Sequence, residues 1–362
     1  TNIMNVLDES IYGHTHAKNQ IMKVIGQWMS GEQSGYCFGF EGNPGIGKCL
    51  AKNTPVMLYD GKIKLVQDIT ITDKLMGDDS NPRNILALGR GRERMYRIEQ
   101  MKGDDYVVNE SHILSLKMTK PQTKGDRHQT ILGKRYYKND IVNICVRDYL
   151  SIPKYLQDCL KGYKVGLSFD DQTVSLEPYA LGYWLGDGDK TTFRITTNEK
   201  EVIDYFTQYA TMYNLQLTKN HTSYHITTGK KGGYKDRNSL LNMLREYNLL
   251  GNKHIPQEYQ LNSREKRLEL LAGLIDSDGH YSLSSNSFEI THKNQDLAND
   301  ILFLARSLGM RGTMKECKKS CIYKGEKRYG IYCRIIITGE GLQDIPVKCP
   351  RKKARKHNQI KN

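Results

Sequence analysis

The sequence LAGLIDSDG at residues 271–279 decides the fold of much of this chain, and ALGYWLGDG at residues 180–188 repeats its pattern 91 positions earlier (271 minus 180). Each stretch has the composition of a short apolar helix that ends in Asp-Gly. Small residues stand four positions apart in both: Gly182 and Gly186, and Gly273 and Ser277. Residues at this spacing share one helical face, where two backbones can approach closely. The pattern therefore predicts two helices packed side by side.

The acids that end these stretches, Asp187 and Asp278, predict a metal site. If the helices pack through their small residues, both carboxylates reach the same end of the pair, where they repel unless a divalent cation lies between them. Oxygen ligands suit Mg²⁺, which assists the hydrolysis of phosphodiester bonds. Gly188 and Gly279 are expected in the turns that end the helices. The alternative is plain core packing, which two copies of the Asp-Gly ending disfavour.

Alternating polar and apolar residues predict strands between and after the two helices. The expected strands are residues 193–197, 224–228, 288–292 and 334–338. One face would pack on helices while the other offers Arg, Thr and His to bases and phosphates. Lysine-rich segments at 230–237 and 315–328 would lie along a duplex backbone, although a charged run alone is also typical of a solvated loop.

The sequence GNPGIGKC at residues 42–49 reads as a phosphate-binding P-loop up to Lys48. Its backbone N–H groups would wrap phosphate oxygens, and its lysine would reach the β- and γ-phosphates. The residues predicted to contact ATP are Gly42, Gly45, Gly47 and Lys48. A P-loop continues with Ser or Thr, but Cys49 follows here, and a thiolate is a poor ligand for Mg²⁺. We favour a change of identity between Lys48 and Cys49 over a degenerate P-loop.

The chain differs in texture on the two sides of this break. Before it, apolar spacing predicts a helix over residues 17–29 and a buried strand over 35–41, a short α/β fragment. After it, an all-β region is expected, with a hairpin around Asp60-Gly61. The expected strands are residues 55–59, 62–66, 84–89, 95–99, 106–108 and 112–117. The basic stretch 117–138 is either a DNA-contacting arm or a basic linker.

Composition narrows the class of protein. The 362 residues leave room for two or three domains, and the formal charge of +14 favours a polyanionic partner such as DNA. No apolar run approaches the roughly 20 residues of a membrane span, so we expect no membrane partner. Eight cysteines without a disulfide-framework spacing indicate an intracellular setting.

The two Asp-Gly stretches resemble the LAGLIDADG (DOD-type) homing endonucleases. The resemblance implies an α+β domain at residues 170–345 with two pseudo-symmetric αββαββα halves, which would act as a monomer on double-stranded DNA. It makes Asp187 and Asp278 the Mg²⁺ ligands and implies a double-strand break in an allele that lacks the insert. Asp189 and Asp276 are not assigned as ligands.

The sequence NKHIP at residues 252–256 resembles the Lys-x-Ile-Pro block of this family. The resemblance implies that Lys253 activates the attacking water or steadies the phosphate. A second such lysine is expected after Asp278. Its candidates are Lys348, Lys352 and Lys353.

The phrases CLAKNTPV (49–56) and NESH (109–112) resemble the first half of an intein with the Hedgehog/intein (Hint) fold. The resemblance implies that the Cys49 thiol attacks the Lys48 carbonyl in an N–S acyl shift, while His112 protonates the departing nitrogen. Asn109 stands where the family has Thr, and we expect Asn109 and Lys48 to support splicing. Splicing also needs Ser, Thr or Cys after the insert, and one Ser or Thr would complete the P-loop as well.

The sequence YGHTHAK at residues 12–18 resembles the start of AAA+ ATPase modules of the Lon-like type. We therefore expect a multidomain chain: a host fragment (1–48), the first part of a Hint domain with a basic arm (49–154), the endonuclease, and a basic segment (346–362) leading to missing closing strands. Such a chain would need its host flanks as partners and would not complete splicing alone. ATP would bind only to the spliced host. The alternatives are a cleavage-inactive DNA-binding remnant and an ATPase with an unusual insertion.

Overall fold

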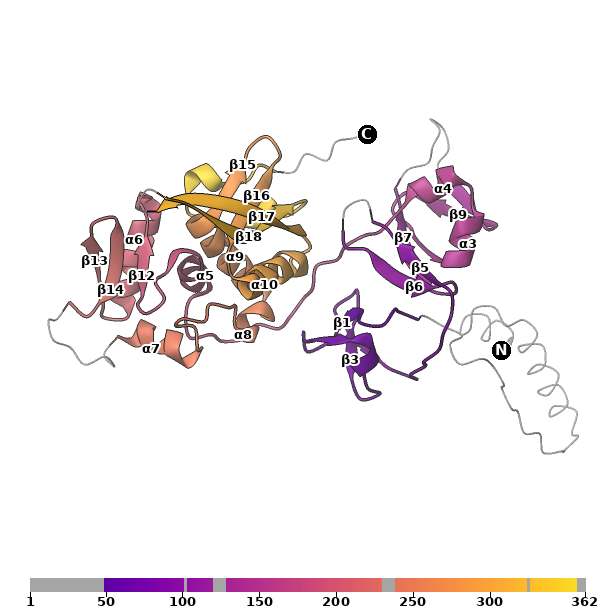
Figure 1. The fold of residues 1–362 in the computed structure, drawn as a ribbon, viewed down its shortest axis with the longest axis horizontal. Coiled ribbons are helices and arrows are strands. Elements are labelled where there is room, and N and C mark those ends of the chain that lie inside the picture. Colours follow the sequence, from indigo (N-terminus) through magenta and orange to yellow (C-terminus); the bar gives the residue numbers. More distant parts are fainter. Residues whose placement is uncertain (1–48, 101–102, 120–127, 230–237, 324–325, 357–362) are drawn as a thin grey trace, which may run out of the picture. The chain divides into compact units, whose positions relative to one another are not determined.

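A computed structural model describes residues 49–100, 103–119, 128–229, 238–323 and 326–356 of the chain (Figure 1). The expected helix at 17–29, the expected strand at 35–41 and the lysine-rich segment 230–237 lie outside the described residues. So do the predicted ATP contacts Gly42, Gly45, Gly47 and Lys48. Among the described helices, none has the length and apolar character needed to cross a membrane.

The region after Cys49 consists of short antiparallel strand pairs and two short helices. Its strands are β1 (Pro55–Met57), β2 (Ile63–Leu65), β3 (Lys74–Met76), β4 (Pro82–Asn84), β5 (Met95–Ile98), β6 (Tyr106–Asn109), β7 (Ile113–Met118), β8 (His128–Ile131), β9 (Lys134–Tyr137), β10 (Ile141–Cys145) and β11 (Leu160–Lys161). Its helices are α3 (Val146–Ser151) and α4 (Lys154–Cys159). The two helices depart from the all-β expectation. Their buried residues, Val146 and Leu156, join the core of β7 and β10.

Most strands predicted in this region are present. The hairpin of β1 and β2 turns at Gly61, whose φ of 79° favours glycine. The strand expected at residues 84–89 was wrong: β4 ends at Asn84, and Leu86 is 93% exposed. The glycines and arginines that follow leave no apolar face to bury against a neighbour. Within the basic stretch 117–138, β8 and β9 form a hairpin.

The remaining described residues, from Leu167 onward, form a second core built around α5 (Pro178–Asp187) and α9 (Arg264–Asp278). The elements after α5 are β12 (Arg194–Thr196), α6 (Lys200–Met212), β13 (Gln216–Asn220), β14 (Ser223–Thr227), α7 (Ser239–Glu246) and α8 (Gln257–Gln260). The elements after α9 are β15 (Gly279–Ser282), β16 (Ser287–His292), α10 (Gln295–Ser307), β17 (Arg311–Tyr323), β18 (Glu326–Thr338), η3 (Leu342–Asp344) and η4 (Pro350–Lys352).

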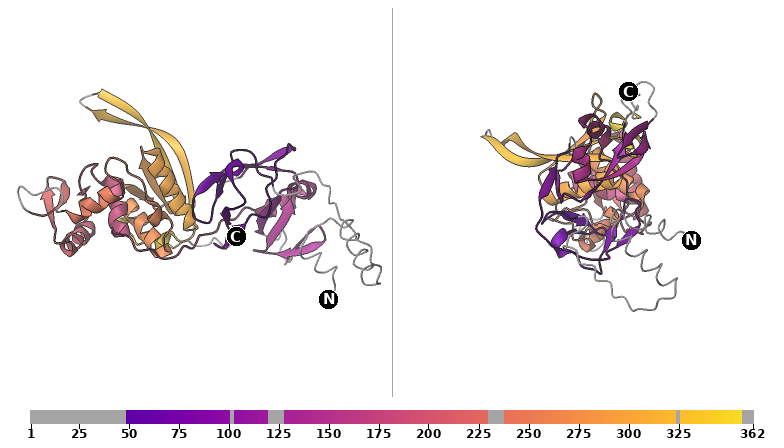
Figure 2. Two further views of the ribbon diagram at one scale, coloured as in Figure 1. Left: turned by 90° about the horizontal axis from the view of Figure 1, so that it is seen from below. Right: turned by 90° about the vertical axis from the view of Figure 1, so that its right-hand side faces the viewer.

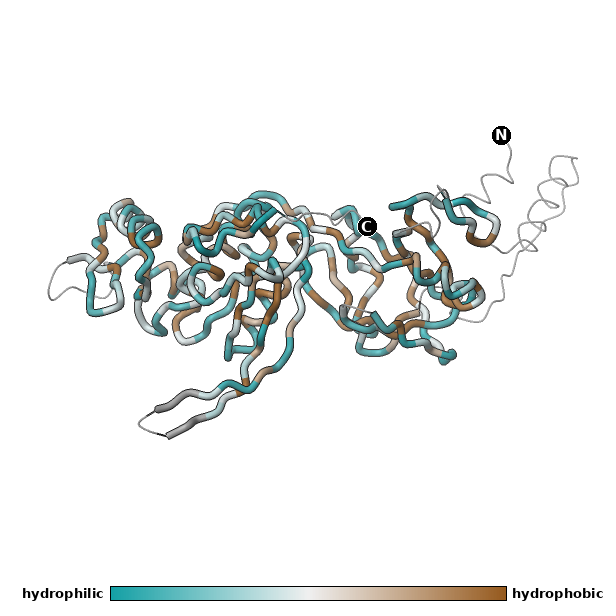
Figure 3. Tube along the Cα trace, turned by 90° about the horizontal axis from the view of Figure 1, so that it is seen from above, coloured by the Kyte–Doolittle hydropathy of each residue, from teal (hydrophilic) through white to brown (hydrophobic). Residues whose placement is uncertain are grey.

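Each of the two helices is followed by an antiparallel sheet. Among the described residues, the first sheet has the order β12-β14-β13 and the second has the order β15-β16-β18-β17. The second sheet continues into a long two-stranded ribbon of β17 and β18, seen edge-on in Figure 2. Its base carries the buried residues Cys333, Ile335 and Ile337, and hydrophobic colour concentrates there in Figure 3. These alternate residues face α10, whose buried side includes Ile301 and Leu304.

Candidate functional site

Helices α5 and α9 pack against each other through the small residues noted in the sequence. A methyl group added to Gly182 would overlap the backbone carbonyl of Leu270. One added to Gly273 would overlap the backbone of Tyr179, one turn before Gly182. Because backbone atoms cannot move aside cheaply, only glycine permits this approach. The packing brings the last residues of the two helices together.

Those last residues are Asp187 and Asp278. A methyl group added to the neighbouring Gly186 would lie 3.5 Å from the Asp278 carboxyl carbon, so the two helix ends are adjacent. The pKa of Asp278 is raised, first by loss of hydration and second by the negative charge of Asp187. Its side chain nonetheless remains exposed at the helix end, while the Thr196 backbone N–H donates to Asp187 Oδ2 at 2.6 Å. The pair is therefore electrostatically coupled and open to a ligand.

Lys253 binds the end of α5. Its ammonium donates to the carbonyl oxygens of Trp184, Leu185 and Gly188 at 2.9, 3.0 and 2.7 Å. It also lies 4.8 Å from the centroid of the Trp184 ring, a favourable position for a cation. Burial lowers the pKa of Lys253 to about 8, against the opposing effect of the charges on Asp278 and Asp187.

Lys352 binds the end of α9 in the same manner. Its ammonium donates to the carbonyl oxygens of Ile275 and Asp276, both at 2.8 Å. The residue is only 3% exposed, and burial lowers its pKa. Of the three candidates for a second lysine, Lys352 is therefore the one that occupies the position of Lys253. Lys353 is exposed, and the Lys348 amine points onto two aromatic rings.

The loop that carries Lys253 is anchored by α10. Asn294 Nδ2 donates to the Lys253 carbonyl at 2.9 Å, and the Ile255 backbone N–H donates to Asp300 Oδ2 at 2.8 Å. Gln260 donates to the other oxygen of Asp300 at 3.1 Å. These bonds fix the backbone on both sides of the lysine.

Asp189 and Asp276 have structural contacts. Asp189 pairs with Arg194 at 3.1 Å and accepts from the Thr191 backbone N–H at 2.9 Å, which orders the loop after α5. The buried Asp276 accepts from the Tyr179 hydroxyl at 2.8 Å. These contacts agree with the expectation that neither acid is a metal ligand.

The donor set at the helix ends fits Mg²⁺. Among the described residues, no group of three or more His, Cys, Asp or Glu side chains gathers as a complete metal cage. Mg²⁺ does not require one, because it is usually held by one or two carboxylates and keeps water or phosphate oxygens as its other ligands. Asp187 and Asp278 repel each other where they stand, and a divalent cation would relieve that repulsion.

The strands expected to meet DNA present few free arginines. Arg194 is paired with Asp189, and Arg334 Nε lies 3.1 Å from Glu289 Oε1. Lysines 315, 318 and 319 are exposed along β17. Lys318 lies over the exposed ring of Tyr329 at 4.6 Å, so the β17–β18 ribbon carries most of the available positive charge in this region.

In the Hint-like region, Cys49 and Asn109 are joined through two hydrogen bonds. The Cys49 N–H donates to Asn109 Oδ1 at 3.2 Å, and the Asn109 backbone N–H donates to the Cys49 carbonyl at 3.1 Å. His112 follows in the turn after β6, where its N–H donates to the Asn109 carbonyl at 3.2 Å. The fold thus brings together three of the four residues predicted for splicing, while Lys48 lies outside the described residues.

Glu93 is a residue of this site that sequence reasoning missed. Asn109 Nδ2 donates to Glu93 Oε2 at 2.7 Å, and the charge of Glu93 adds to burial in raising the pKa of the Cys49 thiol. No motif contains Glu93, which lies in an irregular, arginine-rich segment. The only available signal was its place a few residues before the strand that pairs with β6.

Two family models match the chain. Residues 49–145 match a homing-endonuclease-associated Hint model, and residues 254–361 match a homing endonuclease model. A replicative DNA helicase DnaB from Mycobacterium intracellulare is 31% identical over 281 residues, which cover 74% of this chain and 44% of that protein. The catalytic subunit of a V-type proton ATPase from Candida tropicalis is 22% identical over 418 residues, covering 83% and 38%. The chain spans less than half the length of these relatives.

Solved structures of the homing endonuclease I-DmoI are also similar. Mesophilic variants of it are 17% identical, with a TM-score of 0.31, over 45% of this chain and 87% of theirs. Its complex with DNA and Ca is 17% identical, with a TM-score of 0.30, over 45% and 82%. The two family matches are the informative result: the chain joins a Hint region to a homing endonuclease region, and so combines the enzyme classes of DNA endonuclease and protein splicing.

Proposed function

We propose that this chain is an intein whose endonuclease is of the LAGLIDADG type and makes a Mg²⁺-dependent double-strand break in an allele lacking the insert. The observation that carries the proposal is the meeting of Asp187 and Asp278 at the ends of two closely packed helices. The last carbonyls of the same helices bind Lys253 and Lys352. Two acids and two amines around one exposed position suit the cleavage of a phosphodiester bond.

Each residue has a distinct role in this proposal. Asp187 and Asp278 would hold Mg²⁺, which supplies a positive charge that stabilises the negative charge developing on the phosphate. Lys253 and Lys352 keep their amines at the helix ends, where they steady the phosphate and orient the attacking water. An amine with a pKa near 8, like that of Lys253, can also exchange a proton near neutral pH.

We propose that the endonuclease comprises residues 170–345 and continues through Ala354. Val347 and Cys349 are buried in the same core as α5 and α9, and Ala354 packs against that core. The αββαββα halves are supported by the order of elements after α5 and after α9, although the first described sheet has one strand fewer. Since one chain supplies both acids and both lysines, a monomer would suffice to cut both strands.

The Hint region would carry out an N–S acyl shift. The Cys49 sulfur forms a thioester bond with the Lys48 carbonyl carbon, the Lys48–Cys49 C–N bond breaks, and the thiol proton is balanced by a proton gained at the Cys49 nitrogen. Asn109 Oδ1 holds the N–H of that bond, and His112 would supply the proton. The Cys49 thiol has a raised pKa, so attack requires a base to remove its proton.

The host is proposed to be an intracellular ATPase whose P-loop is interrupted after Lys48. The support is the GxxxxGK sequence of residues 42–48 together with relatives described as a DNA helicase and a proton ATPase. Host flanks on both sides would be joined by splicing, and ATP would bind only after that step.

Plasmid cleavage tests the endonuclease proposal. A supercoiled plasmid carrying the uninterrupted host coding sequence should become linear with Mg²⁺ and remain intact with EDTA. A plasmid carrying the insert should not be cut. Asp187→Asn and Asp278→Asn should abolish cleavage. If the wild-type chain binds the first plasmid tightly but never cuts it, the alternative of a DNA-binding remnant replaces the proposal.

A further inference from the structure

The residues that deliver Lys352 to α9 need an anchor of their own. Lys352 ends a single short turn, η4, which follows the irregular stretch 345–349. Such a turn has little internal stability, so the position of Lys352 depends on contacts made by its neighbours. Two of those neighbours, Lys348 and Cys349, direct their backbone N–H groups toward the carboxylate of Asp276.

The Asp276 carboxylate holds the backbone before η4. Its Oδ2 accepts from the Lys348 N–H at 2.5 Å and from the Cys349 N–H at 3.3 Å. The Tyr179 hydroxyl donates to the same oxygen at 2.8 Å. Asp276 lies two residues before Asp278 on α9, so these bonds tie the segment to the helix whose end Lys352 binds.

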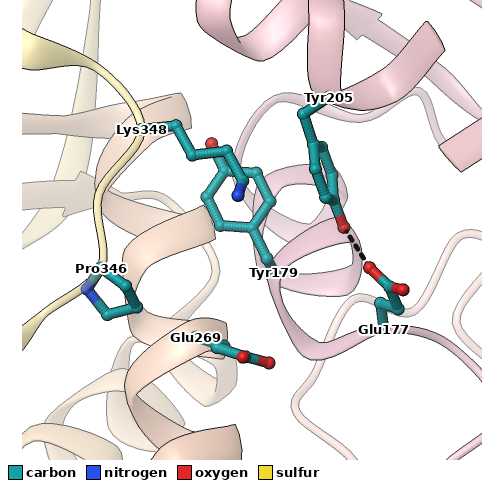
Figure 4. A pocket seen from close by; sticks show the side chains of 6 residues that line it. All are labelled: Glu177, Tyr179, Tyr205, Glu269, Pro346 and Lys348. Carbon is teal, nitrogen blue, oxygen red and sulfur yellow. Dashed lines mark hydrogen bonds between the residues drawn. The ribbon is translucent and has the colours of Figure 1, made fainter. Parts of the chain in front are cut away.

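The Lys348 side chain adds a second anchor, drawn in Figure 4. Its ammonium lies 4.5 Å from the centroid of the Tyr179 ring and 4.4 Å from that of Tyr205. The Tyr205 hydroxyl donates to Glu177 Oε2 at 2.8 Å. With Glu269 and Pro346, these side chains line a cavity of about 280 Å³. A cation between two aromatic faces is attracted by both, and the two carboxylates add to that attraction.

Lys348 lies far from the reacting position. Tyr179 precedes Asp187 by eight residues on α5, which corresponds to roughly 12 Å along the helix. The Lys348 ammonium lies over the Tyr179 ring, at the opposite end of α5 from the proposed Mg²⁺ site. Any effect of this side chain on cleavage must therefore act through Lys352.

We propose that Lys348 is a positioning residue: its ammonium, clamped between Tyr179 and Tyr205, and its backbone bond to Asp276 together set the position of Lys352 on the end of α9. This inference rests on the proposed endonuclease function. Because Lys253 has separate anchors at Asn294 and Asp300, loss of the clamp should disturb only one of the two lysines.

The test compares Lys348→Met, which keeps the length of the chain and removes the charge, with Lys348→Arg, which keeps the cation. Lys353→Met is the matched control, since it removes one charge from an exposed neighbour. A fourth variant, Tyr205→Leu, removes one wall of the clamp. The measurements on the full chain are hydrogen exchange of the peptide 345–356 and single-turnover cleavage of the plasmid.

We expect faster exchange in that peptide for Lys348→Met and Tyr205→Leu, and wild-type exchange for Lys348→Arg and Lys353→Met. The maximal cleavage rate of Lys348→Met should fall between about tenfold and about 100-fold with KM nearly unchanged, as for a misplaced catalytic group. Nicked circles should accumulate because one strand is still cut at the normal rate. Recovery of the rate in Lys348→Arg completes the expected pattern.

Unchanged exchange in Lys348→Met overturns the inference, and so does a loss confined to KM or shared equally by Lys348→Arg. Failure of the proposed function is a separate outcome. In that case the wild-type chain itself does not cut the plasmid with Mg²⁺, and the exchange measurements alone decide whether the clamp holds the segment.

Discussion

Lys253 and Lys352 bind equivalent carbonyl groups on two different helices. Lys253 donates to the oxygens of Trp184 and Leu185 and Lys352 to those of Ile275 and Asp276, and each of the latter lies 91 positions after its counterpart (275 minus 184, 276 minus 185). The same interval separates Asp187 from Asp278. The carbonyl ends of helices carry partial negative charge, so each amine is stabilised there while remaining beside an acid. The two lysines thus share one structural solution.

Replacing either lysine should slow cleavage far more than it weakens DNA binding. We expect Lys253→Met and Lys352→Met each to reduce the single-turnover rate by about 10²- to 10⁴-fold, the range for a positioned acid or base. Labelled strands of a linear substrate would show which strand each variant still cuts. Lys266→Met is a control, because that amine pairs with Asp171 near the start of α9.

Equal loss on both strands for each variant would argue against one lysine per strand. Loss of DNA binding in place of rate would indicate that the amines contact the backbone without taking part in the reaction. Circular dichroism should accompany both measurements, since each substitution leaves carbonyl groups at a helix end without their donor.

Asp278→Asn should stabilise the metal-free protein and remove its stabilisation by Mg²⁺. The pKa of Asp278 is raised by loss of hydration and by the charge of Asp187, so its ionised form is disfavoured in the folded state at neutral pH. The neutral amide relieves that repulsion but provides a weaker ligand. Thermal unfolding with and without Mg²⁺ measures both effects, because a ligand of the folded state raises Tm.

Asp204→Asn is a suitable control, since that exposed carboxylate lies on α6. It should leave the Mg²⁺-dependent rise in Tm intact. A wild-type Tm that does not respond to Mg²⁺, or one that responds equally in Asp278→Asn, would remove this acid from the metal site.

Stability should fall as the pH is lowered through the range below 6.5, partly because of His292. Burial lowers the pKa of this histidine, and the nearby charge of Lys253 lowers it further. The unfolded chain therefore binds a proton near pH 6.5 that the folded chain does not take up until lower pH, which favours unfolding as the pH falls. Urea unfolding at pH 7.5 and 5.5 should show a smaller difference for His292→Gln than for the wild type.

His280 provides the comparison for this effect, because it lies exposed on β15. His280→Gln should keep the pH dependence of the wild type. A His292→Gln variant with the full wild-type dependence would assign the acid sensitivity to other groups.

The sequence carried the helix pair and its acids but only part of what surrounds them. Small residues at a spacing of four predicted the contact of α5 with α9, because that pattern has few other uses in an apolar helix. Gly188 and Gly279 were expected for their backbone freedom, yet their φ values are −66° and −81°, which any residue adopts. Glycine is needed there because an added methyl group would overlap Trp184 and crowd Ile275.

The contacts that hold Lys352 could not be predicted, because they depend on tertiary packing. Lys348, Lys352 and Lys353 stand in one basic run, and their sequence does not distinguish an amine over tyrosine rings from one on a helix end. Glu93 is a similar case, since it reaches Asn109 from an irregular segment. Patterns of local spacing describe elements, whereas these contacts join residues that only the folded chain brings together.

Gly182→Ala and Gly273→Ala should destabilise the protein. Within a helix, alanine is favoured over glycine by about 1 kcal/mol, so a net loss means that the steric overlap outweighs propensity. Overpacking of this kind typically costs about 1–3 kcal/mol, and here the overlapping atoms are backbone. Urea unfolding gives the free energy. Gly162→Ala, whose methyl group would meet only the flexible end of Gln100, should be nearly neutral, and equal effects at all three positions would contradict the close packing of α5 on α9.

Asn109 offers a test of the Hint site that does not depend on DNA. Its side chain holds the Cys49 N–H and is itself held by Glu93, so Asn109→Ala should remove the group that orients the bond between Lys48 and Cys49. Cleavage of that bond by dithiothreitol, followed by mass spectrometry, reports formation of the thioester. We expect Asn109→Ala to slow it by about tenfold to 100-fold, as for a misoriented reacting group. Asn109→Thr, which keeps a side-chain oxygen, should retain more of the rate, and Cys49→Ala should abolish it. An Asn109→Ala rate equal to the wild type would mean that the bond is oriented by other contacts.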